Sequence, residues 1–266
     1  MAADPKRGLS RRQQQIADRV LSVSEMTYPT LAEQFGISQM TAYRDAQRLS
    51  DLGLVRRVRG GITAQSSSVF ESSLQFRGQM HRAEKEALSG ACLEMIEPGM
   101  SIIVDDGTTL LPLAERLHER TPVTVMTSFL PMISQLAGVQ GITLVILGGT
   151  YRSKYDAAGG TLCADLISGL RTDLLLLCPS AVHDGRALHQ DEEMIATKRA
   201  MMRSAERRIL VADHSKLGRR AMHTLSAVRD FHAVLTDDGA DAAALAHVED
   251  QGVPITLVPT APSSLR

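Results

Sequence analysis

Side chains suited to hold a small polar molecule recur where short apolar runs end. One such place is 105–109, where Asp105 and Asp106 precede Gly107, Thr108 and Thr109. Hydroxyl and backbone N–H groups can bind an anion, and the dipole of a helix that we expect to begin at Thr109 would add to the attraction. Elsewhere, Lys216 can supply a positive charge. The alternative interpretation is that these are ordinary turn and N-cap residues.

Other apolar runs end in similar residues. These are Thr127-Ser128, Gly148-Gly149-Thr150, Pro179-Ser180, Asp213-His214-Ser215-Lys216 and Thr236-Asp237-Asp238. The apolar runs have the length of buried strands, and amphipathic patterns between them predict helices. We expect strands at 102–105, 123–127, 142–147, 174–178, 209–213, 231–236 and 255–258, and helices at 82–96, 109–119, 130–137, 162–170, 192–207 and 241–248. This alternation predicts an α/β domain with a mainly parallel sheet, whose ligands bind at the carboxyl ends of the strands.

The N-terminal part has the pattern of a helix-turn-helix followed by a wing. A first helix is expected at 11–23, with Ile16, Val20 and Val23 on one face. A second is expected after Pro29 with Thr30 as N-cap, and a third at 39–51 with Ser38 as N-cap. Residues 54–63 alternate apolar and basic side chains around Gly60-Gly61, as in a β-ribbon. The pattern is typical of a winged helix whose third helix enters the major groove of DNA.

Side chains on the exposed face of the third helix and on the wing can contact bases or phosphates, and Arg44 can pair bidentately with guanine. Ala42, Ala46 and Leu49 are expected to pack inward. In the alternative interpretation, Arg44 and Asp45 are only an exposed charged pair. The candidate DNA-binding residues are Ser38, Gln39, Thr41, Tyr43, Arg44, Arg48, Arg56, Arg57 and Arg59.

The run TLAEQFGISQMTAYRDAQRLSDLGLVRRVRGGIT resembles the N-terminal signature of DeoR-family transcriptional regulators, from the second helix through the wing. Tyr43 stands where that family usually has a second arginine. The stretches SIIVDDGTT, VTVMTSF, LVILGGTY, EEMIATKRAMM and LVADHSKLG resemble the family's C-terminal sensor domain, which is similar in fold to ribose phosphate isomerases and binds sugar phosphates.

The resemblance implies an effector site formed by Asp105, Gly107, Thr108, Thr109, Thr127, Ser128, Gly148, Gly149, Asp213 and Lys216. Asp106 replaces a small residue, Ser128 an asparagine, and Cys178-Pro179-Ser180 a glycine-rich turn. A carboxylate would repel a phosphate. These replacements favour a sugar or polyol effector over a phosphorylated one, with Asp106 accepting hydrogen bonds from the hydroxyls of a polyol.

Composition and charge fit this organisation. Of 266 residues 44% are hydrophobic and the net charge is −1, but residues 1–65 carry +4 and the remainder −5. We expect a DNA-binding domain at 1–65, a Ser-rich linker at 66–80 and an effector-binding domain at 81–266. We expect no secretory signal, because residues 1–10 lack an apolar segment, and no membrane span, because no apolar run approaches roughly 20 residues. Three cysteines without metal spacing favour a reducing, cytoplasmic setting.

The sequence thus predicts a repressor of a carbohydrate catabolic operon. It would bind double-stranded operator DNA as a homo-oligomer, a dimer or tetramer, and be released by a sugar, polyol or sugar phosphate. No cofactor, metal or membrane partner is expected, and the His183, Asp184, His189 and Asp191 segment is interpreted as a solvated loop. The alternative is an isomerase-like enzyme that uses the acidic residues and Lys216 for proton transfer.

Overall fold

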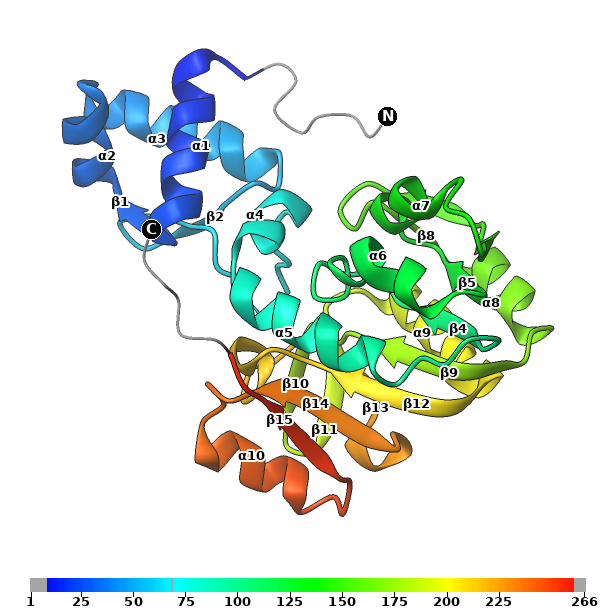
Figure 1. Cartoon of the computed structure of the whole chain (residues 1–266). Helices are drawn as coiled ribbons and strands as arrows, with labels where there is room; N and C mark the ends of the chain where they lie inside the picture. Colours follow the sequence, from blue (N-terminus) through cyan, green and yellow to red (C-terminus); the bar gives the residue numbers. More distant parts are fainter. Residues whose placement is uncertain (1–8, 68, 261–266) are drawn as a thin grey trace. The chain divides into compact units, whose positions relative to one another are not determined.

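The computed structural model describes residues 9–67 and 69–260 and divides into two compact units (Figure 1). The first unit, which we call the head, ends at Gln79, and the second, the body, begins at Met80. Within the described part of the chain, no helix has the length and apolar character needed to cross a membrane.

Helices α1, α2 and α3 form the helix-turn-helix part of the head, and two of them have the bounds expected from the sequence. Helix α1 (Arg11–Val23) begins after the N-cap Ser10 and buries Ile16 and Val20, but Val23 is 40% exposed. The expected inward position of Val23 is therefore wrong. Helix α3 (Gln39–Asp51) begins after Ser38, whose hydroxyl accepts a hydrogen bond from the Thr41 N–H at 3.2 Å. This N-cap confirms the prediction.

Helix α2 (Tyr28–Phe35) starts earlier than expected. Its N-cap is Thr27, not Thr30, because the Thr27 hydroxyl accepts from the Thr30 N–H at 3.3 Å. Pro29 lies inside the first turn, where the N–H that proline lacks has no partner within the helix. The helix ends at Gly36, whose φ of 60° is left-handed, as the turn requires.

The wing is confirmed and gains a strand. Strands β2 (Arg56–Val58) and β3 (Gly61–Thr63) are antiparallel, and β1 (Glu25–Thr27) pairs with the other side of β3. A Cβ at Gly61 would collide with the Met26 carbonyl, so this close strand pairing requires glycine. The Ser-rich segment expected as a linker packs within the head, since the Ser72 hydroxyl donates to the Ala64 carbonyl at 2.6 Å, and helix α4 (Leu74–Gln79) follows.

The body is built on a seven-stranded sheet in the order β15-β14-β12-β9-β4-β5-β6, and all neighbouring strands in it are parallel. The expected mainly parallel sheet is therefore confirmed. Its strands are β4 (Ser101–Val104), β5 (Val123–Thr127), β6 (Ile142–Ile146), β9 (Thr172–Leu177), β12 (Ala205–Val211), β14 (Ala233–Asp237) and β15 (Ile255–Val258).

Helices of the body cover the sheet. Helix α5 packs against α6 and α6 against α7, whereas α8 packs against α9 (Figure 1). Right-handed crossovers place α6 and α7 on one face and α8 and α9 on the other, because the chain reverses its direction across the sheet after β6. The helices are α5 (Arg82–Leu93), α6 (Leu113–Arg116), η1 (Leu117–Arg120), α7 (Leu130–Leu136), α8 (Thr161–Ser168), α9 (Glu192–Ser204), η2 (His214–Lys216), η3 (Val228–Asp230) and α10 (Ala242–Glu249).

Two small antiparallel sheets lie outside the main sheet. Strands β7 (Thr150–Arg152) and β8 (Ala157–Gly159) form one, and β10 (Ala181–His183), β11 (Arg186–His189) and β13 (His223–Ala227) form the other. The solvated loop expected over His183 to Asp191 is wrong. Asp184 and Gly185 have φ of 47° and 66° and form a tight hairpin turn, and His189 is buried. All three cysteines are buried and free.

Candidate functional site

The outward face of α3 carries the side chains expected to contact DNA. Gln39, Tyr43, Arg44 and Arg48 are exposed, and on the wing Arg57 and Arg59 are exposed as well. The opposite face of α3 is fully buried through the three expected residues, Ala42, Ala46 and Leu49. The helix is therefore anchored by small apolar side chains and leaves a polar face open to solvent.

Asp45 is not the partner of Arg44. It is 4% exposed and accepts hydrogen bonds from Arg12 Nε at 2.7 Å and from Gln13 Nε2 at 2.8 Å, which joins α3 to α1. The interpretation of Arg44 and Asp45 as an exposed charged pair is therefore wrong. Arg44 is left on the surface with its guanidinium available to a phosphate or a base edge.

Tyr43 connects the wing to α3. The Arg57 guanidinium lies 4.5 Å from the centre of the Tyr43 ring and donates to the Tyr43 hydroxyl at 2.5 Å. It also donates to Gln47 and to the hydroxyl of Tyr28, whose ring packs on Tyr43. Arg57 is therefore held against α3, whereas Arg56 is half-buried and Arg59 exposed. Ser38 and Thr41 share a hydrogen bond at the start of α3.

In the body, the chain changes direction across the sheet between β4 and β9. Ligands of open α/β sheets bind at such switch points, outside the carboxyl ends of the strands. Asp105 and Asp106 follow β4 at this place, and the Cys178 N–H after β9 donates to Asp105 at 3.0 Å. The expected gathering of strand ends therefore occurs around these carboxylates.

Lys198 from α9 is the shared ion-pair partner of both carboxylates. Its Nζ donates to the two Asp105 oxygens at 2.7 and 2.6 Å and to Asp106 Oδ1 at 2.6 Å, and its side chain is only 1% exposed. Asp106 Oδ1 therefore already accepts a hydrogen bond from the ammonium group of Lys198. That Asp106 also accepts hydrogen bonds from the hydroxyls of a polyol stays a prediction.

The two carboxylates differ in acidity. Burial raises the pKa of Asp105 to about 7, although Lys198 opposes the rise. Burial also acts to raise the pKa of Asp106, but Lys198, His189 and the hydrogen bonds outweigh it and lower that pKa to about 2. Near neutral pH the pair therefore shares less than two full negative charges with one lysine.

The Gly107, Thr108 and Thr109 loop does not open a helix. Helix α6 begins only at Leu113 and has four residues, so the expected helix dipole at Thr109 is wrong. Lysines approach the loop instead. Lys85 Nζ donates to the Thr108 hydroxyl at 3.0 Å, and Lys216 Nζ donates to the Thr109 hydroxyl at 2.9 Å. Positive charge at this loop thus comes from side chains.

Asp213 faces the same cations. Its carboxylate lies 3.9 Å from Lys216 and accepts from the Ser215 hydroxyl. Burial acts to raise the pKa of Asp213, but Lys216, Ser215, His81 and Lys85 together lower it. Asp213 is therefore an anion that holds the lysine of the D-x-S-K segment in place.

The remaining predicted residues fall into two kinds. Thr127, the last residue of β5, and Ser128, which follows it, are fully buried, and the Ser128 hydroxyl has no hydrogen-bond partner among the described residues. Gly148 and Gly149 follow β6. A Cβ at Gly149 would come within 2.8 Å of the Gly159 carbonyl oxygen and the Cys163 Cβ, so packing alone requires this glycine.

Lys85, Lys198 and His189 belong to this charged network but were not expected in it. Lys198 lies in the EEMIATKRAMM stretch, which carried the family resemblance but no chemical role. Its partners are more than 90 residues away, so no local pattern pairs them. The signal in the sequence is the pair of adjacent acids after a buried strand, because buried carboxylates need a positively charged partner.

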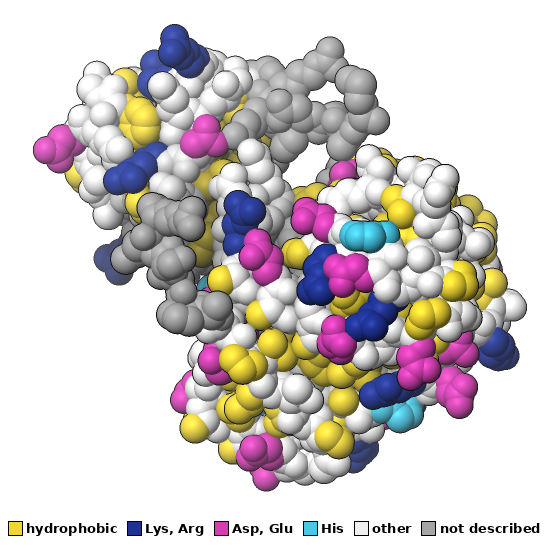
Figure 2. All heavy atoms as spheres, in the orientation of Figure 1, with side chains coloured by type: hydrophobic (Ala, Val, Ile, Leu, Met, Phe, Trp, Pro, Cys, Tyr) yellow, Lys and Arg dark blue, Asp and Glu magenta, His cyan; other side chains and the backbone are white. Residues whose placement is uncertain are grey.

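A cavity of about 710 Å³ lies away from this edge, near the start of β12, and contains four arginines. Two of them, Arg199 and Arg208, already donate to backbone carbonyls at 2.8 Å. On the face seen in Figure 2, the Lys and Arg side chains of the body lie among Asp and Glu side chains rather than in one basic surface. The cavity is thus separate from the predicted effector residues.

Comparisons with known proteins agree with both units. The "DeoR-like helix-turn-helix domain" matches residues 12–68, and the "DeoR C terminal sensor domain" matches residues 80–238. A solved ribose 5-phosphate isomerase A of Methanocaldococcus jannaschii aligns with 50% of this chain and 52% of its own, at 17% identity and a TM-score of 0.36.

Curated relatives resemble most of the chain. The "Glycerol-3-phosphate regulon repressor" of Escherichia coli is 32% identical over 78% of this chain and 82% of its own. The "Putative aga operon transcriptional repressor" of the same species is 28% identical over 94% of both chains, and the "Transcriptional repressor AccR" of Agrobacterium fabrum is 29% identical over 86% of this chain and 89% of its own. The chain therefore belongs to the DeoR family of transcriptional regulators.

Proposed function

We propose that this protein is a repressor of a carbohydrate catabolic operon, which binds operator DNA as a homo-oligomer and releases it when a sugar, polyol or sugar phosphate binds the body. The observation that carries the proposal is the polar face of α3, which exposes Gln39, Tyr43, Arg44 and Arg48 on a rigid, fully buried support. A major groove admits such a helix, and its outward arginines can pair with guanine.

The effector would bind at the carboxyl ends of β4, β5 and β12. Lys216 at the Thr109 hydroxyl and Lys85 at the Thr108 hydroxyl supply the positive charge that a phosphate needs. The Ser128 hydroxyl, which has no hydrogen-bond partner within the described part of the chain, supplies a hydrogen-bonding group for a sugar hydroxyl. One relative is named for glycerol-3-phosphate, a phosphorylated polyol, which supports this class of effector.

Ligand sensing explains the buried charges better than isomerase chemistry. Asp105 and Lys198 are fully buried and form an ion pair with each other, whereas a general base must reach a proton on its substrate. Each head bears a modest net charge of +4, so tight and specific binding is expected to need two heads on paired half-sites.

A mobility-shift assay on the DNA upstream of the protein's own coding sequence tests the proposal. The wild-type chain is expected to shift this DNA, and a panel of sugars, polyols and their phosphates is expected to contain a compound that releases it. Arg44→Ala should weaken specific binding about 10- to 100-fold by loss of one bidentate base contact. Arg19→Ala, an exposed arginine on α1, is the matched control and should bind normally.

Lys216→Met tests the effector site separately. It should bind operator DNA as wild type does, but require at least about tenfold more effector for release, since it lacks a charge-assisted contact. Lys154→Met, at an exposed position, is its control. Turnover of a sugar phosphate without a specific DNA shift would reject the regulator in favour of an isomerase.

A further inference from the structure

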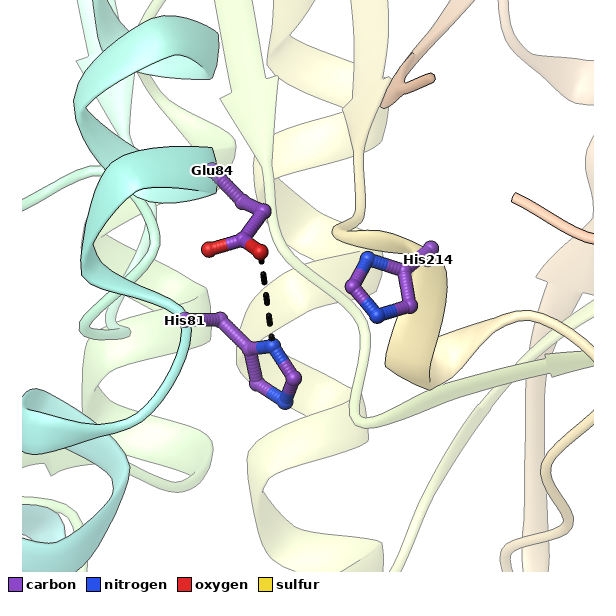
Figure 3. A group of neighbouring side chains, drawn as sticks. All are labelled: His81, Glu84 and His214. Atoms are coloured by element: carbon purple, nitrogen blue, oxygen red, sulfur yellow. Dashed lines mark ion pairs between the residues drawn. The ribbon is translucent and has the colours of Figure 1, made fainter. Parts of the chain in front are cut away.

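Two histidines and a glutamate form a compact group in the body that the charged network described above does not include. His81, Glu84 and His214 each offer one ligand atom, and these atoms lie within 4.8 Å of one another (Figure 3). His81 Nδ1 lies 3.9 Å from a Glu84 carboxylate oxygen, and the rings of His81 and His214 meet edge to face with centres 5.0 Å apart. Each side chain is 23–30% exposed, so a solvent ion can reach the group.

Two separate elements bring these side chains together. His81 is the N-cap of α5 and Glu84 lies in its first turn, so an i, i+3 spacing places both on one side of the helix end. His81 has the left-handed φ of 53°, and its side chain makes no capping hydrogen bond. His214 begins η2 after β12. Figure 3 shows it beside the pair from α5.

Asp237 orients His214. Its carboxylate, 1% exposed at the end of β14, lies 2.6 Å from His214 Nδ1 and accepts the His214 backbone N–H at 2.7 Å. A carboxylate bonded to one ring nitrogen fixes the tautomer and leaves Nε2 as the basic nitrogen. This carboxylate-histidine arrangement is the usual outer partner of a metal-bound histidine.

The surrounding charge favours a cation. The carboxylates of Glu84, Asp213 and Asp237 lie around the two histidines, and the ammonium groups near them are those of Lys85 and Lys216. Both lysines are directed at other partners, since they donate to the Thr108 and Thr109 hydroxyls. With neutral histidines the group keeps an excess of negative charge.

We propose that His81, Glu84 and His214 bind one Zn²⁺ ion, with Asp237 as the positioning residue of His214. Two imidazoles and one carboxylate are a ligand set that zinc accepts, and three protein ligands leave a fourth position open. Tetrahedral bonds of about 2.0–2.1 Å bring ligand atoms to about 3.3 Å from one another. The three side chains would therefore close inward around the ion by rotation about their side-chain bonds.

A consequence follows for the effector, and it rests on the proposed function. The predicted effector residues and the histidine group share Asp213, Lys85 and Lys216 as neighbours. Together the network holds five carboxylates, those of Glu84, Asp105, Asp106, Asp213 and Asp237, against three lysines. A divalent ion offsets this excess and lets an anionic or hydroxylated effector approach through the open position.

The test is direct metal binding by the full chain, purified without a histidine tag and dialysed against chelator. Co²⁺ is the probe, because its visible absorption reports tetrahedral nitrogen and oxygen coordination, and Zn²⁺ should displace it at one equivalent. His81→Ala and His214→Ala should each abolish the tetrahedral spectrum. Asp237→Asn should weaken Co²⁺ binding about 10- to 100-fold while retaining the spectrum at high Co²⁺.

His247→Ala, which removes an exposed histidine from α10, is the matched control and should give the wild-type spectrum. A wild-type chain that shows no tetrahedral Co²⁺ spectrum at one equivalent overturns the site, as does an unchanged spectrum in His214→Ala. Circular dichroism of each variant verifies that it is folded. Because the measurement uses neither DNA nor effector, its failure is distinguishable from failure of the repressor function.

Discussion

The charged side chains predicted to bind DNA lie on the surface of the head, whereas those of the network around Asp105 are largely buried in the body. Arg44 and Arg48 project from α3 into solvent, whereas Lys198, Asp105 and Asp106 are at most 5% exposed. Removal of an exposed charge changes the free energy of unfolding little, and an exposed positive charge is available to a large polyanion such as DNA. A buried charge is held only by its partners, so its removal affects the fold before it affects a ligand. Variants in the two units therefore need different measurements.

The largest effect is expected from Lys198→Met, because it leaves two buried carboxylates without a counter-charge. The unfolding free energy of the body should fall by about 3–5 kcal/mol, measured by urea denaturation followed by circular dichroism. Arg207→Met, at an exposed position of β12, should change it by less than about 0.5 kcal/mol.

Removing all three charges sharpens this prediction. The triple variant Lys198→Met, Asp105→Asn, Asp106→Asn should recover part of the lost stability, since no unpaired charge remains buried. If Lys198→Met alone costs less than about 1 kcal/mol, the contrast between a charged interior in the body and a charged surface on the head fails.

The pH dependence of stability is the next effect in size. Burial raises the pKa of Asp105 to about 7, so between about pH 4 and 7 the folded chain keeps a proton that the unfolded chain has lost. Stability therefore falls as pH rises through this window, with a slope from this one group of up to ~1.4 kcal/mol per pH unit. Asp106, with its pKa lowered to about 2, contributes stability above about pH 4 that is lost as pH falls toward 2.

Asp105→Asn should flatten the fall between pH 4.5 and 7.5, measured as the difference from wild type in urea denaturation at each pH. Exposed Asp165→Asn is the control and should keep the wild-type slope. An unchanged slope in Asp105→Asn would mean that Asp105 is ionised throughout this range and that Lys198 fully offsets its burial.

The same contrast explains how much could be predicted from the sequence. The bounds of α1 and α3, the wing and the seven strands follow from local periodicity and capping, and they were predicted nearly as observed. The helix expected at 109–119 is shortened to α6, Leu113–Arg116. Leu110 and Leu113 are both buried, but only part of this segment is helical, and periodicity alone does not reveal where the helix begins. The Asp184-Gly185 hairpin was missed although its turn residues are typical.

In the charged network of the body, the residues at strand ends could be predicted from the sequence and those on helices could not. The strand ends indicated Asp105, Asp213 and Lys216, because position in an α/β fold determines where strand ends meet. Lys85 and Lys198 lie on helices, where a charged residue normally predicts a solvated face. Their inward direction depends on tertiary packing between segments far apart in the chain.

Within the head, a large stability effect is expected at Asp45, a buried acid that joins α3 to α1. Asp45→Ala removes the acceptor of Arg12 and Gln13 and should destabilise the head by about 1–3 kcal/mol. Thermal unfolding measures it, with exposed Glu33→Ala as control. An unaffected melting temperature would place Asp45 with the surface charges of the head rather than with the buried charges of the body.

The smallest effect tests whether Tyr43 contacts DNA or supports Arg57. Tyr43→Phe keeps the ring beneath the guanidinium and removes only the hydrogen bond to its hydroxyl, so operator affinity should fall about two- to fivefold. Arg57→Ala should reduce the dependence of log affinity on log salt by about one, the signature of a lost phosphate contact. Tyr43→Phe should leave that slope unchanged, because Arg57 stays in place.

A loss above about tenfold in Tyr43→Phe with an unchanged salt slope would instead assign the Tyr43 hydroxyl a direct base contact. Tyr43→Arg extends the test, because it supplies the arginine usual in the family and removes the ring that holds Arg57. If the role of Tyr43 is to position Arg57, the new arginine should steepen the dependence of log affinity on log salt, while the contacts that join Arg57 of the wing to Tyr43 of α3 are lost. Sequence preference at the bases nearest the wing should then relax, a change that selection of binding sites from a random DNA pool would measure.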